Sequence, residues 1–381
     1  MASAGQTDFE EYGLSRGPYP VAGRLLLLTV DFEAFAPEVL PLWVDAMHHW
    51  ATCAERTGLR FSFFLSVEDA VRILATAGDA PRRFLGAMRR LDEAGSLFYA
   101  HNHFVFDPET GQKKPLAQEP GDLPRGYGKR KSLFFDAVHR HRLRLAAWLT
   151  TVREVHEKVL SDAGCRRPAV QAFRAGGWDY GSTPQETELY LDSLASAGFA
   201  IDSSACRGTF GTATWRVGAD FGRNVFRLTH GLLEVAPTWA MDMSGSPTSA
   251  AAVGNLLRLG VQAQLWTGRS GACVVVLHFD HLFRPRPHGS LERLDHREPA
   301  SVSGRIERCF RVLVLLQSIL RLRCATFEDL DATAWPGRLA EEGRGLGVRE
   351  GSGPGESRRG QPDDRRTTGQ DSAATSGRFG S

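Results

Sequence analysis

Short apolar runs that alternate with longer segments of helical periodicity constrain the fold of this 381-residue chain more than any other feature. The short runs are rich in Val, Leu and Phe, which is typical of strands buried on both faces of a parallel sheet. The alternation itself is typical of a mainly parallel sheet flanked by helices. We therefore predict an α/β fold, a distorted (β/α) barrel of about seven to eight strands.

The expected elements follow from the positions of these runs. Strands are predicted at residues 25–30, 60–65, 97–101, 169–174, 200–203, 231–235, 274–278 and 323–326. Helices are predicted at residues 38–57, 81–94, 133–160, 184–197, 250–266 and 303–320. Gly58, Gly95 and Gly198 follow three of these helices, where glycine is the usual C-terminal cap.

Composition divides the chain into three parts. Residues 336–381 are expected to form a disordered tail, because they contain almost no large apolar residue and cannot offset the entropy of ordering. Residues 1–22 are expected to be a flexible arm, and residues 23–335 the single barrel domain. A barrel domain of this kind needs about 250 residues, which this middle part supplies.

The charge balance argues against two classes of partner. Lys and Arg together number 46 and Asp and Glu 44, so the net charge is +2 and there is no basic field to attract nucleic acid or an anionic membrane. No apolar run approaches the ~20 residues that cross a bilayer, and no secretory signal pattern is present. We expect a cytoplasmic protein, with its six cysteines reduced.

Polar residues gather where predicted strands end, which is where reactive groups converge in a parallel barrel. Asp31 and Glu33 lie two apart in extended chain and point to one side. His103 and Asp107 lie four apart and would meet Glu33 if their segment turns once. One imidazole and two carboxylates suit Zn²⁺, Mn²⁺, Co²⁺, Fe²⁺ or Ni²⁺, which leaves Asp31 as a base. His101 is the alternative to Asp107 as the third ligand.

Several motifs together resemble those of the NodB-like polysaccharide deacetylases, carbohydrate esterase family four. The matching segments stand in family order at residues 29–33, 61–65, 102–108, 174–178, 202–204 and 275–278. Two positions depart from the family pattern. Asp107 stands where the family has a second ligand histidine, and Gly176 stands where it usually has proline.

The resemblance implies a role for each matching residue. The expected metal ligands are Glu33, His103 and Asp107; the catalytic residues are Asp31 as base, Arg174 as its partner, His278 as acid and Asp202 as partner of His278; and Gly177 and Trp178 are the substrate-binding residues that line the oxyanion hole. His281 is the alternative to His278 as the acid.

The expected activity is metal-dependent removal of an N-acetyl group from an amino sugar or glycan precursor, with a divalent ion such as Zn²⁺ as cofactor. The substituted ligand and the missing proline motivate a first alternative, a catalytically inactive carbohydrate-binding protein. A metal-dependent hydrolase of a non-sugar amide is the second alternative. The sequence leaves the oligomeric state open.

Overall fold

A computed structural model of the chain describes residues 8–33, 39–103, 105–112, 142–176, 180–181, 183–205, 224–241, 271–283 and 299–331. The helix expected at residues 250–266 and the tail expected at residues 336–381 lie outside these ranges. Within them, no helix combines the length and the apolar character that a bilayer-spanning segment needs.

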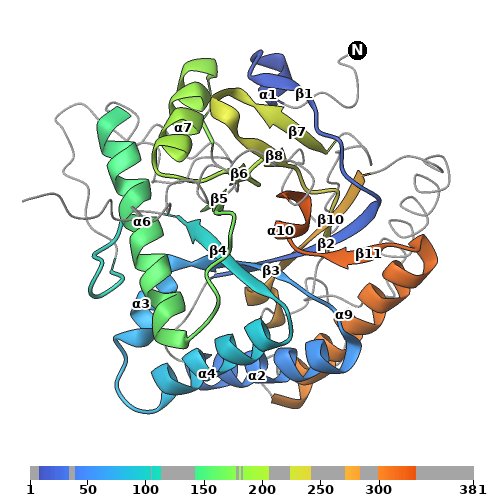
Figure 1. Ribbon diagram of the computed structural model, residues 1–381. Coiled ribbons are helices and arrows are strands. Elements are labelled where there is room, and N and C mark those ends of the chain that lie inside the picture. The colour runs from blue at the N-terminus through green and yellow to red at the C-terminus, as the bar shows by residue number, and fades with distance from the viewer. Residues whose placement is uncertain are drawn as a thin grey trace, which may run out of the picture. The chain divides into compact units, whose positions relative to one another are not determined.

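A mainly parallel sheet forms the centre of the fold (Figure 1). Its strands occur in the spatial order β1-β7-β8-β6-β5-β4-β3-β2-β10-β9, and β11 pairs with β2 beside this path. The parallel strands are β2 (Arg24–Phe32), β3 (Ser62–Ser66), β4 (Leu97–Asn102), β5 (Ala172–Ala175), β6 (Ile201–Asp202), β8 (Leu233–Val235), β9 (Trp239–Met241), β10 (Gly271–His278) and β11 (Arg323–Ala325). At one edge, β7 (Val225–Leu228) and β1 (Ser15–Pro18) add antiparallel pairs.

The predicted α/β class with a mainly parallel sheet is confirmed, and each predicted strand overlaps an observed one. Over the described residues, the sheet is a curved ladder whose edges are β1 and β9. The sequence did not predict β1, β7 or β9, which are only three or four residues long.

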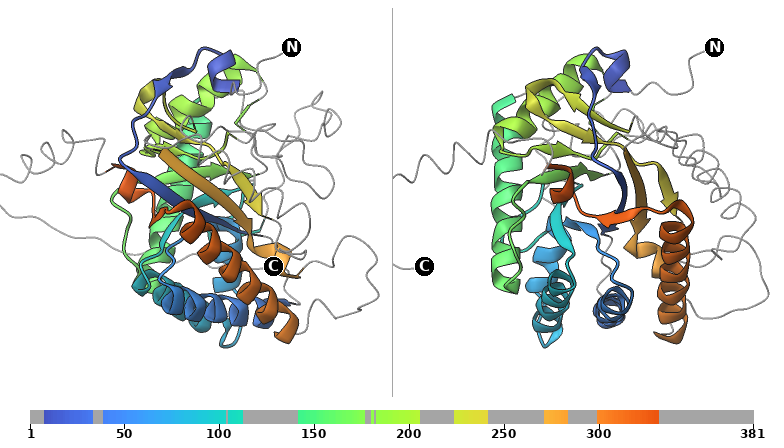
Figure 2. Two further views of the ribbon diagram at one scale, coloured as in Figure 1. Left: turned by 90° about the vertical axis from the view of Figure 1, so that its right-hand side faces the viewer. Right: turned by 45° about the vertical axis from the view of Figure 1, so that its right-hand side comes forward.

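The helices lie on the outside of the curved sheet, as two further views show (Figure 2), except for Glu328–Asp331, whose Leu330 belongs to the apolar cluster of the inner face. They are α1 (Asp8–Glu11), α2 (Leu40–Thr57), α3 (Val67–Leu74), α4 (Ala80–Glu93), α6 (Arg142–Ala163), α7 (Pro184–Ser196), α9 (Pro299–Leu320) and α10 (Glu328–Asp331), with 3₁₀ turns at Thr229–Gly231 and Phe279–Phe283. α2 packs against both α4 and α9, and α6 packs against α7. Gly58 ends α2 at a φ of 68° and donates its N–H to the Ala54 carbonyl, as expected of a glycine cap.

Side chains of the strands alternate between two apolar layers. Leu27, Phe64 and Tyr99 belong to the cluster on the inner face of the curved sheet. Phe63 and Trp50 belong to the larger cluster between the sheet and helices α2, α4 and α9. Residues paired in register on neighbouring parallel strands lie on the same face. The register therefore decides which polar side chains can meet on the inner face.

Part of the segment that we expected to be a flexible arm belongs to the fold. Phe9 is fully buried, and its ring centroid lies 4.8 Å from that of Tyr180 and 6.2 Å from that of Phe226. Strand β1 pairs with β7 a few residues later. The expectation is therefore corrected for residues 8–22, because their apolar side chains are buried and β1 belongs to the sheet.

Candidate metal centre

Three of the predicted catalytic side chains meet on the inner face of the sheet. Strand register places His278 of β10 directly opposite Asp31 of β2. His278 Nε2 lies 3.4 Å from Asp31 Oδ2, and the guanidinium of Arg174 on β5 forms an ion pair with Asp31 Oδ1. All three side chains are buried. The carboxylate therefore contacts a cationic group on one oxygen and an imidazole on the other.

Arg174 is held in one orientation by several partners. Its Nε donates to the Ser203 carbonyl at 3.0 Å, and its Nη2 donates to Ser203 Oγ at 2.8 Å and to Thr29 Oγ1 at 3.1 Å. The guanidinium carbon lies 4.0 Å from the centre of the Phe64 ring. Because a buried guanidinium needs all of its donors satisfied, this network fixes Arg174 and, through it, the Asp31 carboxylate.

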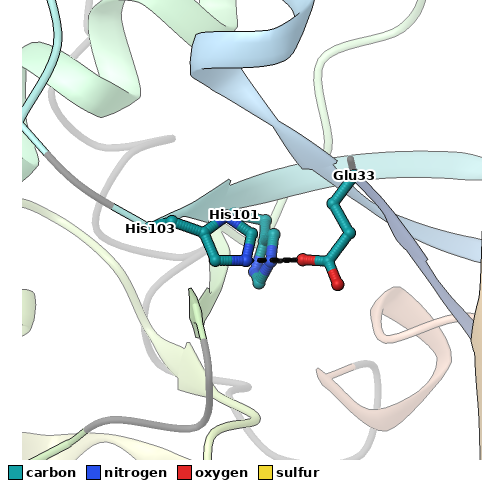
Figure 3. A group of neighbouring side chains, drawn as sticks. All are labelled: Glu33, His101 and His103. Carbon is teal, nitrogen blue, oxygen red and sulfur yellow. Dashed lines mark hydrogen bonds and ion pairs between the residues drawn. The ribbon is translucent and has the colours of Figure 1, made fainter. Parts of the chain in front are cut away.

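Glu33, His101 and His103 bring three ligand atoms together beside this group (Figure 3). Glu33 follows strand β2, while His101 lies in β4 and His103 follows it. Glu33 Oε2 lies 2.7 Å from His101 Nε2 and 2.6 Å from His103 Nε2. The two rings are nearly perpendicular, at 85°, with centroids 4.5 Å apart. Two imidazoles and a carboxylate thus converge on one point.

The outer nitrogen of each imidazole is already committed to an acceptor. His101 Nδ1 lies 2.8 Å from the Arg174 carbonyl oxygen, which can only accept, so Nδ1 carries the proton. His103 Nδ1 lies 3.1 Å from a Glu68 carboxylate oxygen and donates in the same way. In the neutral tautomers, both Nε2 lone pairs then face the Glu33 carboxylate. Protons on Nε2 or a bound metal ion must therefore lie between the rings and the carboxylate, and outward-bonded Nδ1–H groups are typical of metal-binding histidines.

The electrostatics of the group also favour positive charge. Burial opposes the ionisation of Glu33, but the charge of His103 and hydrogen bonds from His101 and His103 outweigh it and hold the pKa of Glu33 well below its usual value. Burial likewise opposes the charging of His103, yet Glu33 and Glu68 raise the pKa of His103 well above its usual value. The carboxylates therefore create a site that attracts a cation.

Glu68, which sequence reasoning missed, supports His103 from helix α3. Its Oε1 accepts from the His103 backbone N–H at 2.8 Å, and its Oε2 accepts from Asn102 Nδ2 at 2.9 Å. Asn102 Oδ1 in turn accepts from Trp148 Nε1 of α6 at 3.2 Å. A signal was present in the sequence: Ser66 directly follows the strand predicted at residues 60–65 and caps α3, which places Glu68 in the first turn of a helix, beside the strand end.

Gly176 stands where the resembling family usually has proline, and the structure gives a reason for a residue without a side chain. A Cβ at this position would overlap the Cδ2, Cγ and Cα atoms of His103. The backbone of Gly176 therefore forms one wall of the site, against which the His103 ring rests.

Asp107 does not belong to this group of ligand atoms. The predicted third ligand is therefore corrected from Asp107 to His101, which was the alternative. Asp107 Oδ1 accepts from the backbone N–H groups of Glu109 at 2.9 Å and Thr110 at 3.1 Å, and so closes a turn. The physical reason is strand geometry. His101 and His103 are two residues apart at a strand end and face the same side, whereas the chain has already turned away at Asp107.

Asp202 also lies elsewhere than predicted. Register places it opposite Phe173 of β5, on the outer face of the sheet, where its Oδ1 accepts from Tyr190 Oη at 2.8 Å and from Ser204 Oγ at 2.6 Å. Burial raises the pKa of Asp202 to about 6. The prediction that Asp202 holds His278 is therefore corrected: Asp202 lies on the outer face of the sheet and binds Tyr190 and Ser204 instead.

Two further predictions concern neighbours of this site. His281 stacks on His278 with ring centroids 5.0 Å apart at an angle of 21°, so it is a close neighbour of the predicted acid. Gly177 and Trp178 lie outside the described residues.

The donor set fits a divalent transition metal. Two imidazole nitrogens and one carboxylate oxygen form the ligand set of many catalytic zinc sites, which keep further positions for water or substrate. The same set accepts Mn²⁺, Co²⁺, Fe²⁺ or Ni²⁺. Glu33, His101 and His103 are thus the residues that would hold the ion, with Asp31 beside them and outside the ligand group.

Comparison with known proteins gives matches in structure only. No model of a protein family matches the sequence, and no curated protein matches it. A candidate polysaccharide deacetylase from Mycobacterium smegmatis is 15% identical with a TM-score of 0.45, over 90% of this chain and 99% of that one. A family 4 carbohydrate esterase from Bacillus anthracis is 12% identical with a TM-score of 0.36, and the match covers 87% of this chain and 95% of that one. A family 4 carbohydrate esterase from Streptomyces lividans, in complex with acetate, is 12% identical with a TM-score of 0.32, and the match covers 77% of this chain and 88% of that one.

The chain is structurally similar, at low identity, to polysaccharide deacetylases and family 4 carbohydrate esterases.

Proposed function

We propose that this chain is a metal-dependent deacetylase that hydrolyses an N-acetyl group on an amino sugar or glycan precursor. One observation carries the proposal. The Nε2 atoms of His101 and His103 converge on the Glu33 carboxylate, with both Nδ1–H groups already bonded outward, immediately beside the Asp31, Arg174 and His278 group.

A divalent ion held by Glu33, His101 and His103 would supply Lewis-acid polarisation of the acyl carbonyl and acidify a water. Asp31 is the group placed to take the proton from that water. Arg174 holds Asp31 Oδ1, so the other oxygen, Oδ2, remains directed toward the site. The arginine acts as a positioning residue, since its own donors are spent on Asp31, Thr29 and Ser203.

His278 is the group placed to protonate the leaving nitrogen. Its Nε2 lies 3.4 Å from Asp31 Oδ2, so base and acid sit on the same side of the sheet within reach of one bound substrate. His281 stacks on the other side of the ring and limits its rotation. Amide hydrolysis then yields acetate and a free amino sugar, with the proton from water ending on the amine.

The inactive carbohydrate-binding alternative loses its main support. It was motivated by Asp107 in place of a ligand histidine, and His101 supplies that imidazole instead. Gly176 in place of proline has its own explanation in the packing of His103. A metal-dependent hydrolase of a non-sugar amide remains a test outcome, because Glu33, His101, His103, Asp31 and His278 are assigned to the amide group of the substrate and none of them to a sugar ring.

The test combines metal content with product release. Full-length protein loaded with Zn²⁺, Mn²⁺ or Co²⁺ is assayed for acetate release from a panel of N-acetylated amino sugars and small N-acetyl amides. We expect release from sugars, a loss of about 10²–10⁴-fold with unchanged metal content in Asp31→Asn, and loss of both metal and activity in His101→Ala. Full activity in Asp31→Asn would refute the mechanism. Metal-loaded protein that binds sugars without releasing acetate would favour the inactive carbohydrate-binding protein. Acetate release from the small amides alone would favour the hydrolase of a non-sugar amide.

A further inference from the structure

A second group of ligand atoms lies between helices α2 and α9, which pack side by side (Figure 1). His49 and Cys53 are one turn apart on α2 and face Glu307 of α9. His49 Nε2 lies 3.8 Å from Cys53 Sγ and 3.5 Å from Glu307 Oε1, and Cys53 Sγ lies 3.7 Å from the same oxygen. A nitrogen, a sulfur and an oxygen therefore form a nearly equilateral triangle.

The size of this triangle matches one face of a tetrahedral zinc site. With Zn–S near 2.3 Å and Zn–N or Zn–O near 2.0–2.1 Å, tetrahedral angles place the ligand atoms about 3.3–3.6 Å apart. The three observed separations of 3.5–3.8 Å exceed these values by only a few tenths of an ångström. Side-chain rotation of the partly exposed His49 and Glu307 can close that difference.

Arg56 lies against this group, and its Nη2 is 3.6 Å from Cys53 Sγ. Its Nη2 donates to Glu307 Oε2 at 2.8 Å, which leaves Oε1 directed at the cysteine and the histidine. Hydrogen bonds of this kind orient carboxylate ligands in metal sites. The Arg56 side chain is 57% exposed, so it can adjust as the site fills.

The charges and the path to solvent are also suitable. Burial and the charge of Glu307 raise the pKa of Cys53 to about 11, so the thiol proton is lost only when the metal displaces it, and the thiolate and the Glu307 carboxylate then balance a divalent cation. The side chains of His49 and Glu307 are 31% and 27% exposed, so an ion can enter and a water can take the fourth position. A thiolate ligand selects Zn²⁺ over Mg²⁺, Ca²⁺ or Mn²⁺.

We propose that His49, Cys53 and Glu307 form a second metal site, selective for Zn²⁺ and chemically similar thiophilic ions, that links α2 to α9. It is separate from the centre at Glu33, because the two groups share no residue and Cys53 lies on the helix-covered face of the sheet, whereas Glu33, His101 and His103 meet on the inner face. The proposal does not depend on the deacetylase activity, since neither helix contributes a ligand to the first centre.

Co²⁺ provides a direct test, because a thiolate ligand gives it a near-ultraviolet charge-transfer band and a site of histidine and carboxylate does not. Chelator-treated full-length protein is titrated with Co²⁺ and then with Zn²⁺. We expect the band in wild type, its displacement by Zn²⁺, and a bound stoichiometry of two Zn²⁺ per chain, falling to one in Cys53→Ser. Cys309→Ser, a buried cysteine of the same α9 helix, is the matched control and should keep the band.

Two more variants make the result decisive. His101→Ala should keep the charge-transfer band of the site at Cys53, while it loses the metal ion bound at the centre at Glu33. His49→Ala, which changes a partly exposed side chain, should weaken Zn²⁺ binding at this site at least tenfold if Cys53→Ser proves unstable. Absence of the band in wild type, or its persistence in folded Cys53→Ser, overturns the second site.

Discussion

Replacing Asp202 by asparagine should make the stability of the protein much less dependent on pH. Asp202 of β6 and Glu234 of β8 are paired in register and are both fully buried. Asp202 Oδ1 accepts from Tyr190 and Ser204, and Glu234 Oε1 accepts from the Ala205 backbone N–H at 3.0 Å. The remaining oxygens, Asp202 Oδ2 and Glu234 Oε2, are buried, and each carboxyl group influences the pKa of the other. We expect the two groups to share a proton in the folded state.

The direction of the effect follows from the two pKa shifts. Burial raises the pKa of Asp202 to about 6, and burial together with the charge of Asp202 raises the pKa of Glu234 well above its usual value. Both groups therefore bind protons more tightly in the folded state than in the unfolded state. Their contribution to stability is fully present below about pH 4 and is lost as the pH rises through 6 and beyond.

The magnitude can be worked out for Asp202. A shift from the usual value of 3.8 to about 6 corresponds to about 3 kcal/mol of unfolding free energy, lost between pH 4 and pH 7. An asparagine side chain in place of Asp202 keeps the acceptor for Tyr190 and Ser204 and offers an N–H to Glu234. The substitution thus removes the titration of Asp202, and it also removes the negative charge of Asp202 that raises the pKa of Glu234. We expect Asp202→Asn to gain on the order of 3 kcal/mol over wild type on going from pH 4 to pH 7.

Urea unfolding followed by circular dichroism at half-unit intervals from pH 4 to pH 8 measures this difference. Glu154→Gln is the matched control, because it makes the same change from acid to amide at an exposed position. The control should follow the wild-type curve. If Asp202→Asn and wild type show the same slope against pH, the two carboxyl groups do not share a proton in the folded state.

Three further predictions concern the centre at Glu33. Gly176→Ala should lower metal affinity at least tenfold by displacing the His103 ring, whereas an unchanged affinity in calorimetry would show that the ring does not rest on this backbone. Glu68→Gln should cost 10–100-fold in affinity, as is typical for the loss of a carboxylate that supports a ligand histidine, and circular dichroism should show an unchanged fold. Zn²⁺ at about 100 times its dissociation constant should stabilise the chelator-treated Cys53→Ser variant by about 2.7 kcal/mol, and no rise in Tm would mean that this centre does not bind the ion.

The sequence predicted the inner face of the sheet well, because strand periodicity and strand ends are local properties. Asp31 and Glu33 were placed correctly relative to each other by the alternation of extended chain. The register of β2 with β10, which brings His278 to Asp31, could only be expected from the general rule that reactive groups gather at the ends of parallel strands.

Errors arose where the chain leaves a strand. Asp107 lies four positions after His103, and that spacing would bring the two side chains together only if the segment made a single turn. Instead, Phe106 is buried with its ring centroid 5.0 Å from Trp148, and Asp107 closes a turn beyond it. The conformation of such a segment depends on tertiary packing against α6, which spacing in sequence does not encode.

Asp202 shows that an error of one residue is enough to reverse a functional assignment. The sequence analysis assigned the function to the acid, but it is the next residue, Ser203, that faces inward and binds Arg174. Because successive side chains of a strand alternate between faces, Asp202 must point outward once Ser203 points inward. Its register partner Glu234 is outward for the same reason, so two acids are buried together behind the sheet. Their burial raises both pKa values, while the backbone and hydroxyl of Ser203 hold the arginine that orients Asp31.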